Sequence, residues 1–190
     1  MFGGPGTKDV YTAINPNVAN DYFPNQKVVG GMDFVGTDFS AGDVDVARNI
    51  PKRDPNPIDE AGHGSHVGGT VAGIGDGVKT YSGVAPEAKL YALKVFGKEG
   101  STSEVAVIDA LEYAADPSEK LDPSERLDVV NLSLGGGYGK PKVFYTEAIK
   151  NLTNGGTIVV ASAGNSGDNP YIVGAPSTAD AAISVAAAID

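Results

Sequence analysis

From Gly62 onward, short apolar segments alternate with longer amphipathic ones, and this alternation constrains the fold more than any other feature of the chain. Val105, Ile108, Leu111 and Ala115 keep the spacing of one helix face, whereas the shorter apolar runs have the length of buried strands. The pattern predicts helices over residues 63–74, 103–115 and 143–154, and strands over residues 89–96, 128–134, 157–163 and 182–187.

Local signals mark the start of the middle helix and the end of the last one. Ser101 and Glu104 are placed as a capping box, in which each side chain pairs with the other residue's amide. Asn154 followed by glycine is a typical helix stop. Residues 1–62 are instead expected to be rich in loops, with a single strand over residues 27–35.

An Asp-Pro-Ser-Glu motif occurs twice in succession, starting at Asp116 and at Asp122. Each copy is expected to begin a single helical turn, because Asp is a favoured helix cap and Pro a favoured first helical residue. We interpret this stretch as a solvated surface excursion rather than a site.

Strands that alternate with helices predict an α/β fold with a mostly parallel sheet and helices on both faces, which is a three-layer, doubly wound architecture. Ligands of such sheets bind beyond the carboxyl ends of the strands. With 190 residues, the chain is long enough to build a buried core.

Charge and composition exclude several functions. Lys and Arg number 14 against 24 Asp and Glu, giving a formal net charge of −10, whereas surfaces that bind nucleic acids or anionic membranes are basic. We therefore expect no nucleic-acid and no membrane partner. The chain has no cysteine, which removes disulfides, thiolate metal sites and cysteine nucleophiles.

Both histidines of the chain lie in the glycine-rich segment that opens the first predicted helix. His63 projects from the helix N-terminus, where the helix dipole disfavours imidazolium and favours a neutral ring that can accept a proton. Two other interpretations compete with a catalytic base. His63 and His66 could be a capping or core pair, or they could bind a metal with Asp59 or Glu60 as a third ligand, although the Glu of a zinc-protease helix is absent.

Two later apolar strands run out into small residues, at positions 133–137 and 163–167. Asn165 presents an amide donor just past the second of these strands, which is the chemistry that holds a developing oxyanion. The alternative is that Asn165 only forms a turn with the Ser and Gly that follow it.

Taken together, these segments resemble the subtilisin-like serine proteases (subtilases). The stretch from His63 to Gly73 is similar to the family's histidine signature, in which the first histidine is catalytic. The segment from Asn131 to Gly136 resembles the lining of the primary specificity pocket, and Ala163-Gly-Asn165 resembles the oxyanion-hole segment. Residues 94–102 resemble the strand that pairs with the substrate backbone.

Two other signatures of the family have no counterpart in the sequence. No Asp is followed by Ser or Thr and then Gly, as the family's catalytic Asp is, and neither methionine follows a serine, as in the family's nucleophile motif. We therefore expect an internal fragment of one peptidase domain, spanning residues 1–190, that is inactive as an isolated chain and whose partners include the rest of that domain.

The resemblance implies a secreted serine endopeptidase that cleaves polypeptides through an acyl-enzyme, with no cofactor required for the reaction and Ca²⁺ as a candidate structural ion without assigned ligands. His63 would be the general base and Asn165 the oxyanion donor. Substrate contacts would come from Gly100, Ser101, Thr102, Ser133, Leu134, Gly135, Gly136, Ala163 and Gly164.

One question concerns calcium binding by the acidic loop, and one alternative concerns the function of the whole chain. The carboxylates between Asp38 and Glu60 lack the spacing of a helix-loop-helix calcium site and are interpreted as a solvated acidic loop. The whole chain could instead be a non-catalytic α/β binding module whose glycine-rich helix start holds an anion.

Overall fold

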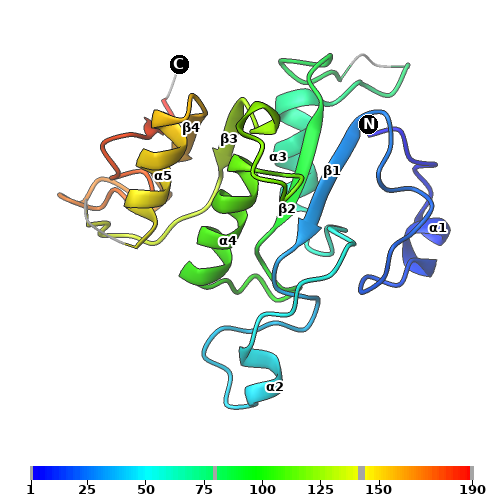
Figure 1. Cartoon of the computed structure of the whole chain (residues 1–190), viewed down its shortest axis with the longest axis horizontal. Coiled ribbons are helices and arrows are strands. Elements are labelled where there is room, and N and C mark those ends of the chain that lie inside the picture. Colours follow the sequence, from blue (N-terminus) through cyan, green and yellow to red (C-terminus); the bar gives the residue numbers. More distant parts are fainter. Residues whose placement is uncertain (1, 79–80, 141–143, 189–190) are drawn as a thin grey trace. The chain divides into compact units, whose positions relative to one another are not determined.

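A computed structural model of the chain describes residues 2–78, 81–140 and 144–188. The chain divides into two compact units, Met1–Ala106 and Val107–Asp190 (Figure 1). The strands pair in parallel in both units, as the alternation of strands and helices predicts.

The first unit is built on two parallel strands, β1 (Val28–Asp33) and β2 (Leu90–Lys94), with the helix α3 (His63–Ala72) between them in the sequence. Because α3 connects two parallel strands, its N-terminus lies toward their carboxyl ends. The strands approach closely at Gly31, whose φ is +141° and where a Cβ atom would overlap the backbone of Ala92. Only glycine fits this position.

A buried ion pair closes the carboxyl end of these two strands. Lys94 Nζ lies 2.5 Å from Asp33 Oδ2, with the Asp33 side chain 1% exposed. Asp33 Oδ1 also accepts from the amides of Val35 and Gly36, both at 2.8 Å, so every charged atom of this carboxylate is occupied. Asp33 is thus a structural residue that fixes where β1 ends.

The long connection from β1 to α3 carries the short helix α2 (Val46–Asn49), and α1 (Lys8–Ala13) precedes β1. Figure 1 shows α2 on an excursion beyond the carboxyl end of β1. Neither helix was expected from the sequence, because each is too short to show helical periodicity.

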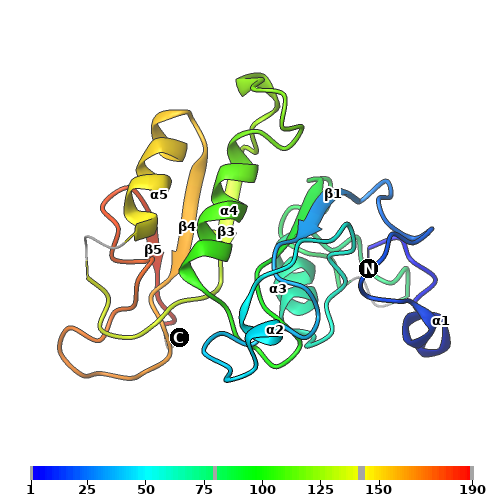
Figure 2. The ribbon, with the colours of Figure 1, turned by 60° about the horizontal axis from the view of Figure 1, so that its bottom comes forward.

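The second unit contains a three-stranded parallel sheet in the order β3 (Val129–Leu132), β4 (Ile158–Ser162), β5 (Ile183–Val185). Figure 2 shows helices α4 (Glu104–Ala115) and α5 (Phe144–Asn154) beside β3 and β4. The core combines alternate strand residues with the inner faces of these helices, namely Val130, Leu132, Val159, Ala161, Leu111, Ala114, Ile149 and Leu152.

The opposite face of this sheet exposes apolar side chains. Val129 and Ile158 are register partners and are 55% and 51% exposed, and Ile183 and Val185 of β5 are 54% and 50% exposed. Soluble proteins seldom leave a contiguous apolar sheet face open to water.

The expected helices and strands are all present within the described residues, but most are one to three residues shorter at one or both ends. The start of the 143–154 helix at Val143 lies outside the described residues, and α5 begins at Phe144. Of the two Asp-Pro-Ser-Glu motifs, the second forms the 3-10 turn η1 (Pro123–Glu125) capped by Asp122, whereas the first forms only a turn around the Asp116 carboxylate.

The expected capping box of α4 is wrong. Ser103 Oγ, not Ser101, accepts from the amide of Ala106 at 3.3 Å, and Ser101 Oγ accepts instead from Ala41 at 2.8 Å. The helix starts later than the Ser101-Glu104 spacing suggests because the Ser101 hydroxyl is used in a long-range contact.

Within the described ranges, none of the helices has the length and apolar character needed to cross a membrane.

Candidate active site

His63 is the first residue of α3, and the backbone turns sharply just before it. The preceding residue, Gly62, has a left-handed backbone with φ +89° and ψ −18°. Such a turn strongly favours glycine, and it lets the chain enter the helix with His63 at its tip. The His63 and His66 side chains are both exposed, so the interpretation of a buried core pair is wrong.

The carboxylate of Asp59 holds this turn in place. Its Oδ1 accepts from the amides of Ala61 at 3.0 Å and Gly62 at 2.8 Å, and its Oδ2 accepts from the amide of Ser65 at 2.6 Å. Asp59 therefore supplies an acceptor to the Ser65 amide in the first turn of α3, which the helix itself cannot satisfy, and binds two amides of the loop before the helix. It caps the helix from three residues before Gly62.

Hydrogen bonding keeps Asp59 ionised. Burial alone would raise the pKa of Asp59, but the amides of Ser65, Gly62 and Ala61 outweigh it and hold that pKa below its ordinary value. A charged carboxylate at the positive end of α3 is also favoured by the helix dipole.

Tyr11 of α1 anchors the same loop from the other side. Its hydroxyl donates to the Asp59 carbonyl oxygen at 2.8 Å. Partial burial, and then the nearby charges of Glu60 and Asp59, raise the pKa of Tyr11, so its hydroxyl stays protonated as a donor. No local sequence pattern indicates this contact, because the two residues are 48 positions apart.

The geometry does not support a metal at the histidines. The Asp59 carboxylate, one of the two candidate third ligands, is turned toward backbone amides. Among the residues that the structure describes, no group of three or more His, Asp or Glu side chains is arranged to hold a metal ion.

In the second unit, the two segments expected to flank a substrate lie at the same edge of the sheet. Leu132 and Ala161 are register partners near the carboxyl ends of β3 and β4, and Ser162 Oγ donates to the Leu134 carbonyl at 3.4 Å. Residues 133–136 and 163–165 therefore leave neighbouring strands side by side, at the carboxyl edge of the sheet where ligands of parallel sheets generally bind.

Backbone contacts fix each of these segments. Gly136 and Ala175 exchange two backbone hydrogen bonds, at 3.0 and 3.1 Å. The Ala163 amide donates to Val185 at 2.8 Å and its carbonyl accepts from Gly174 at 3.1 Å. These bonds hold the backbone in place up to the residue that precedes Gly164.

Asn165 follows Gly164, whose φ is +105°. Its side chain is exposed, and within the described ranges the Asn165 side-chain amide donates to no other residue. A turn-forming role would tie the Asn165 side chain to the backbone two residues on, as Asn15 does with Asn17 at 3.0 Å. Asn165 Oδ1 makes no such bond in the described part of the chain, and the exposed Nδ2 amide is accessible to a ligand.

The third expected substrate segment, residues 100–102, belongs to the first unit together with His63. Gly100 has φ +78° and its amide donates to Gly97 at 2.9 Å, whereas Thr102 Oγ1 donates to the Val95 carbonyl. Within the described residues, the amides of Ser101 and Thr102 donate to no backbone carbonyl, so they are open to an added strand.

The fold and these segments define an α/β protein with polar and glycine-rich segments beyond the ends of parallel strands. The chain belongs to the subtilase family (peptidase S8), whose sequence profile matches residues 9–190. The family expected from the sequence is therefore confirmed.

Individual relatives agree with this assignment. The minor extracellular protease Vpr of Bacillus subtilis (strain 168) is 38% identical over 157 residues, which are 83% of this chain and 17% of that protein. The major intracellular serine protease of the same organism is 32% identical over 164 residues, which are 85% of this chain and 44% of that protein. The chain thus spans less than half the length of these relatives.

A solved structure shows the same fold. Sphericase superposes with a TM-score of 0.53 at 29% sequence identity, covering 62% of this chain and 36% of the Sphericase chain. The α/β, subtilisin-like fold expected from the sequence is confirmed as an incomplete copy of that domain.

Proposed function

We propose that this chain is part of the peptidase domain of a serine endopeptidase that hydrolyses peptide bonds through an acyl-enzyme. The observation that carries the proposal is an exposed imidazole, His63, held at the first turn of α3 by the Asp59 carboxylate, in a chain that the subtilase family matches over residues 9–190. In this role His63 removes the proton from the nucleophile and later delivers it to the leaving amine.

Asn165 would stabilise the negative charge that develops on the substrate carbonyl oxygen. Its open side-chain amide is a neutral donor on a backbone held by the bonds of Ala163, and preorganised donors of this kind lower the barrier to acyl transfer. Residues 100–102 and residues 133–136 would each offer backbone groups with which an extended substrate pairs as an added strand.

The catalytic Asp and Ser of the family would be supplied outside this chain, since their signatures have no counterpart in its sequence. Asp33 is no substitute for the acid, because its carboxylate is already paired with Lys94 and two amides. The two units would then be parts of one peptidase domain, as the single family match across both of them suggests.

Secretion is the proposed location, because the relative Vpr is named an extracellular protease, whereas the second relative is named an intracellular one. Fractionation of the source cells with an antibody against this chain distinguishes the two.

A non-catalytic anion-binding module is the second candidate, and the structure weakens it. Three amides at and just before the start of α3, those of Ala61, Gly62 and Ser65, already donate to the Asp59 carboxylate. A second negative charge there would meet like-charge repulsion.

The test uses the complete peptidase domain, meaning the gene product extended until both missing signatures are included. We expect the domain to hydrolyse a chromogenic peptide. A serine-directed phosphonate should abolish this hydrolysis when one phosphonate is bound per domain. A gene product without these signatures, or a domain whose hydrolysis resists the phosphonate, would contradict the proposed function.

A further inference from the structure

The excursion between β1 and α3 lies directly against the segment expected to bind the substrate backbone. The Lys98 amide donates to the Thr37 carbonyl at 2.9 Å, and the Ala41 amide donates to Ser101 Oγ at 2.8 Å. At Gly97, a Cβ atom would overlap the carbonyl oxygen of Phe39. The two stretches are therefore in backbone contact and leave no space for a side chain between them.

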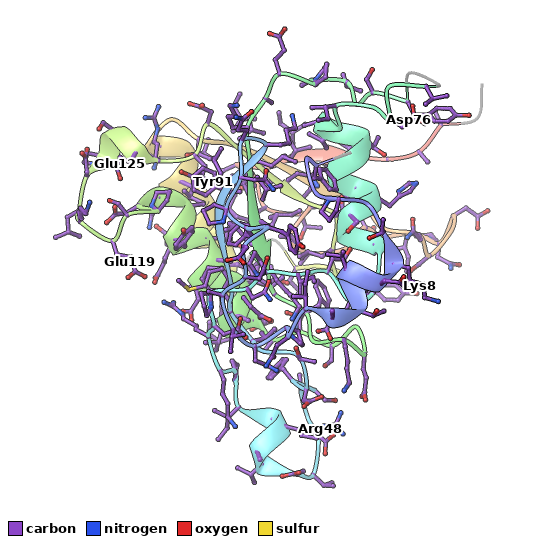
Figure 3. All side chains as sticks on the ribbon, turned by 90° about the vertical axis from the view of Figure 1, so that its right-hand side faces the viewer. Lys8, Arg48, Asp76, Tyr91, Glu119 and Glu125 are labelled. Atoms are coloured by element: carbon purple, nitrogen blue, oxygen red, sulfur yellow. The ribbon has the colours of Figure 1, made fainter. Side chains whose placement is uncertain are left out.

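One side chain of α2 joins this excursion to the segment by charge. Arg48 Nη2 lies 3.0 Å from Glu99 Oε1, and Arg48 Nη1 lies 2.9 Å from Asp43 Oδ2. Its Nε donates to the Asp38 carbonyl at 3.3 Å. All three nitrogens of the guanidinium are thus used, in the planar fork that arginine alone provides. Figure 3 labels Arg48 on α2.

A third ion pair lies beside the two that Arg48 makes. Lys98 Nζ is 2.5 Å from Asp38 Oδ1. An isolated pair at the surface contributes little, but this pair is linked to those of Arg48 at Asp38, whose carboxylate pairs with Lys98 and whose carbonyl accepts from Arg48, so the pairs form a network. The network ends at Glu99, one residue before Gly100, and it leaves the amides of Ser101 and Thr102 open.

We propose that Arg48 is a positioning residue for the substrate: by pairing with Glu99 it fixes the turn that ends at Gly100, and so holds the open amides of Ser101 and Thr102 in place to receive a peptide strand. This inference rests on the proposed function of that segment. A segment ordered before binding loses less conformational entropy when the peptide adds to it, so the pair acts on the affinity for long substrates. It does not act on the chemical step, because Arg48 touches no reacting group.

The test compares Arg48→Ala, Glu99→Ala and the double variant in the complete peptidase domain. Two substrates are used: an extended tetrapeptide anilide, which reaches residues 100–102, and a single-residue ester, which does not. Lys150→Ala is the matched control, since Lys150 loses an exposed pair with Glu147 at 3.6 Å on α5.

We expect each single variant to raise KM for the tetrapeptide by about threefold to tenfold with kcat unchanged. The double variant should equal either single one, because the two residues act as one pair. KM for the ester should stay at the wild-type value in all variants. Lys150→Ala should leave KM unchanged for both substrates.

The outcomes separate this inference from the proposed function. The inference is wrong, and the proposed function stands, if the wild-type domain hydrolyses both substrates but the Arg48 and Glu99 variants have the same KM values as Lys150→Ala. The same holds if these variants lose activity toward both substrates equally. If the wild-type domain hydrolyses neither substrate, the proposed function fails and the inference fails with it.

Discussion

At the scale of single residues, Asn165 has the most specific role in the account. Its amide is open, and its chemistry matters only when negative charge develops on the substrate. Asn165→Ala in the complete domain should therefore lower kcat by about 10²–10³ and leave KM nearly unchanged, a magnitude known for such a donor in a subtilisin and transferred here.

Steady-state kinetics on a chromogenic peptide measure this effect directly. A kcat within twofold of wild type would remove Asn165 from the site. A rise in KM without loss of kcat would mean that Asn165 contacts the ground state of the substrate and not the oxyanion.

At the scale of helices and strands, the Asp59 cap decides how α3 presents His63. Replacing Asp59 by Ala leaves the amides of Ala61, Gly62 and Ser65 without their acceptor and should lower the free energy of unfolding by about 1 kcal/mol at pH 7. Asn at this position should cost less, because its amide oxygen still accepts a hydrogen bond.

The same cap predicts a pH dependence. The folded pKa of Asp59 lies below its ordinary value, so its contribution is fully present above the unfolded pKa of about 4 and is lost as the pH falls through the folded value. Urea unfolding of wild type and Asp59→Ala should thus differ at pH 7 and converge toward pH 2. A difference that stays constant over this range would show that Asp59 does not act through its charge.

Most of the helices and strands could be predicted from the sequence, and the predictions that were wrong have physical causes. Amphipathic spacing located α3, α4 and α5, because their apolar faces pack against strands. The cap of α4 was misplaced because Ser101 bonds to Ala41, a contact 60 residues away that no local pattern shows.

The candidate site was predictable where a local motif carries it and not where packing does. His63 and Asn165 stood out by residue type and neighbours, whereas the pairing of Arg48 with Glu99 joins positions 51 residues apart. The role of Asp59 lies between these cases: an Asp shortly before a predicted helix is a cap signal, but its bonds to three amides need the left-handed turn at Gly62.

At the scale of the whole molecule, the open face of the β3–β4–β5 sheet predicts how the isolated chain behaves. Val129, Ile158, Ile183 and Val185 are each about half exposed on that face. The purified 190-residue chain should self-associate and bind an apolar dye such as ANS. Light scattering and dye fluorescence measure this, with Ile158→Lys as a variant that should reduce both. A strictly monomeric wild-type chain that binds no dye would contradict it.

The isolated chain should also cleave no peptide above the blank rate. An imidazole and an amide can polarise a carbonyl, but no acyl-enzyme forms without a positioned hydroxyl. Phosphonate-sensitive turnover by the lone chain would show that the nucleophile lies within these 190 residues.

The most direct test of the central claim, that His63 is the general base of a serine peptidase, compares kcat/KM of His63→Ala and His66→Ala in the complete domain. Both imidazoles are exposed and only three positions apart, so His66→Ala is a matched control. We predict a loss of about 10⁴-fold or more for His63→Ala, and a value within about threefold of wild type for His66→Ala. Equal losses in both variants, or phosphonate-sensitive hydrolysis by His63→Ala at the wild-type rate, would contradict the account.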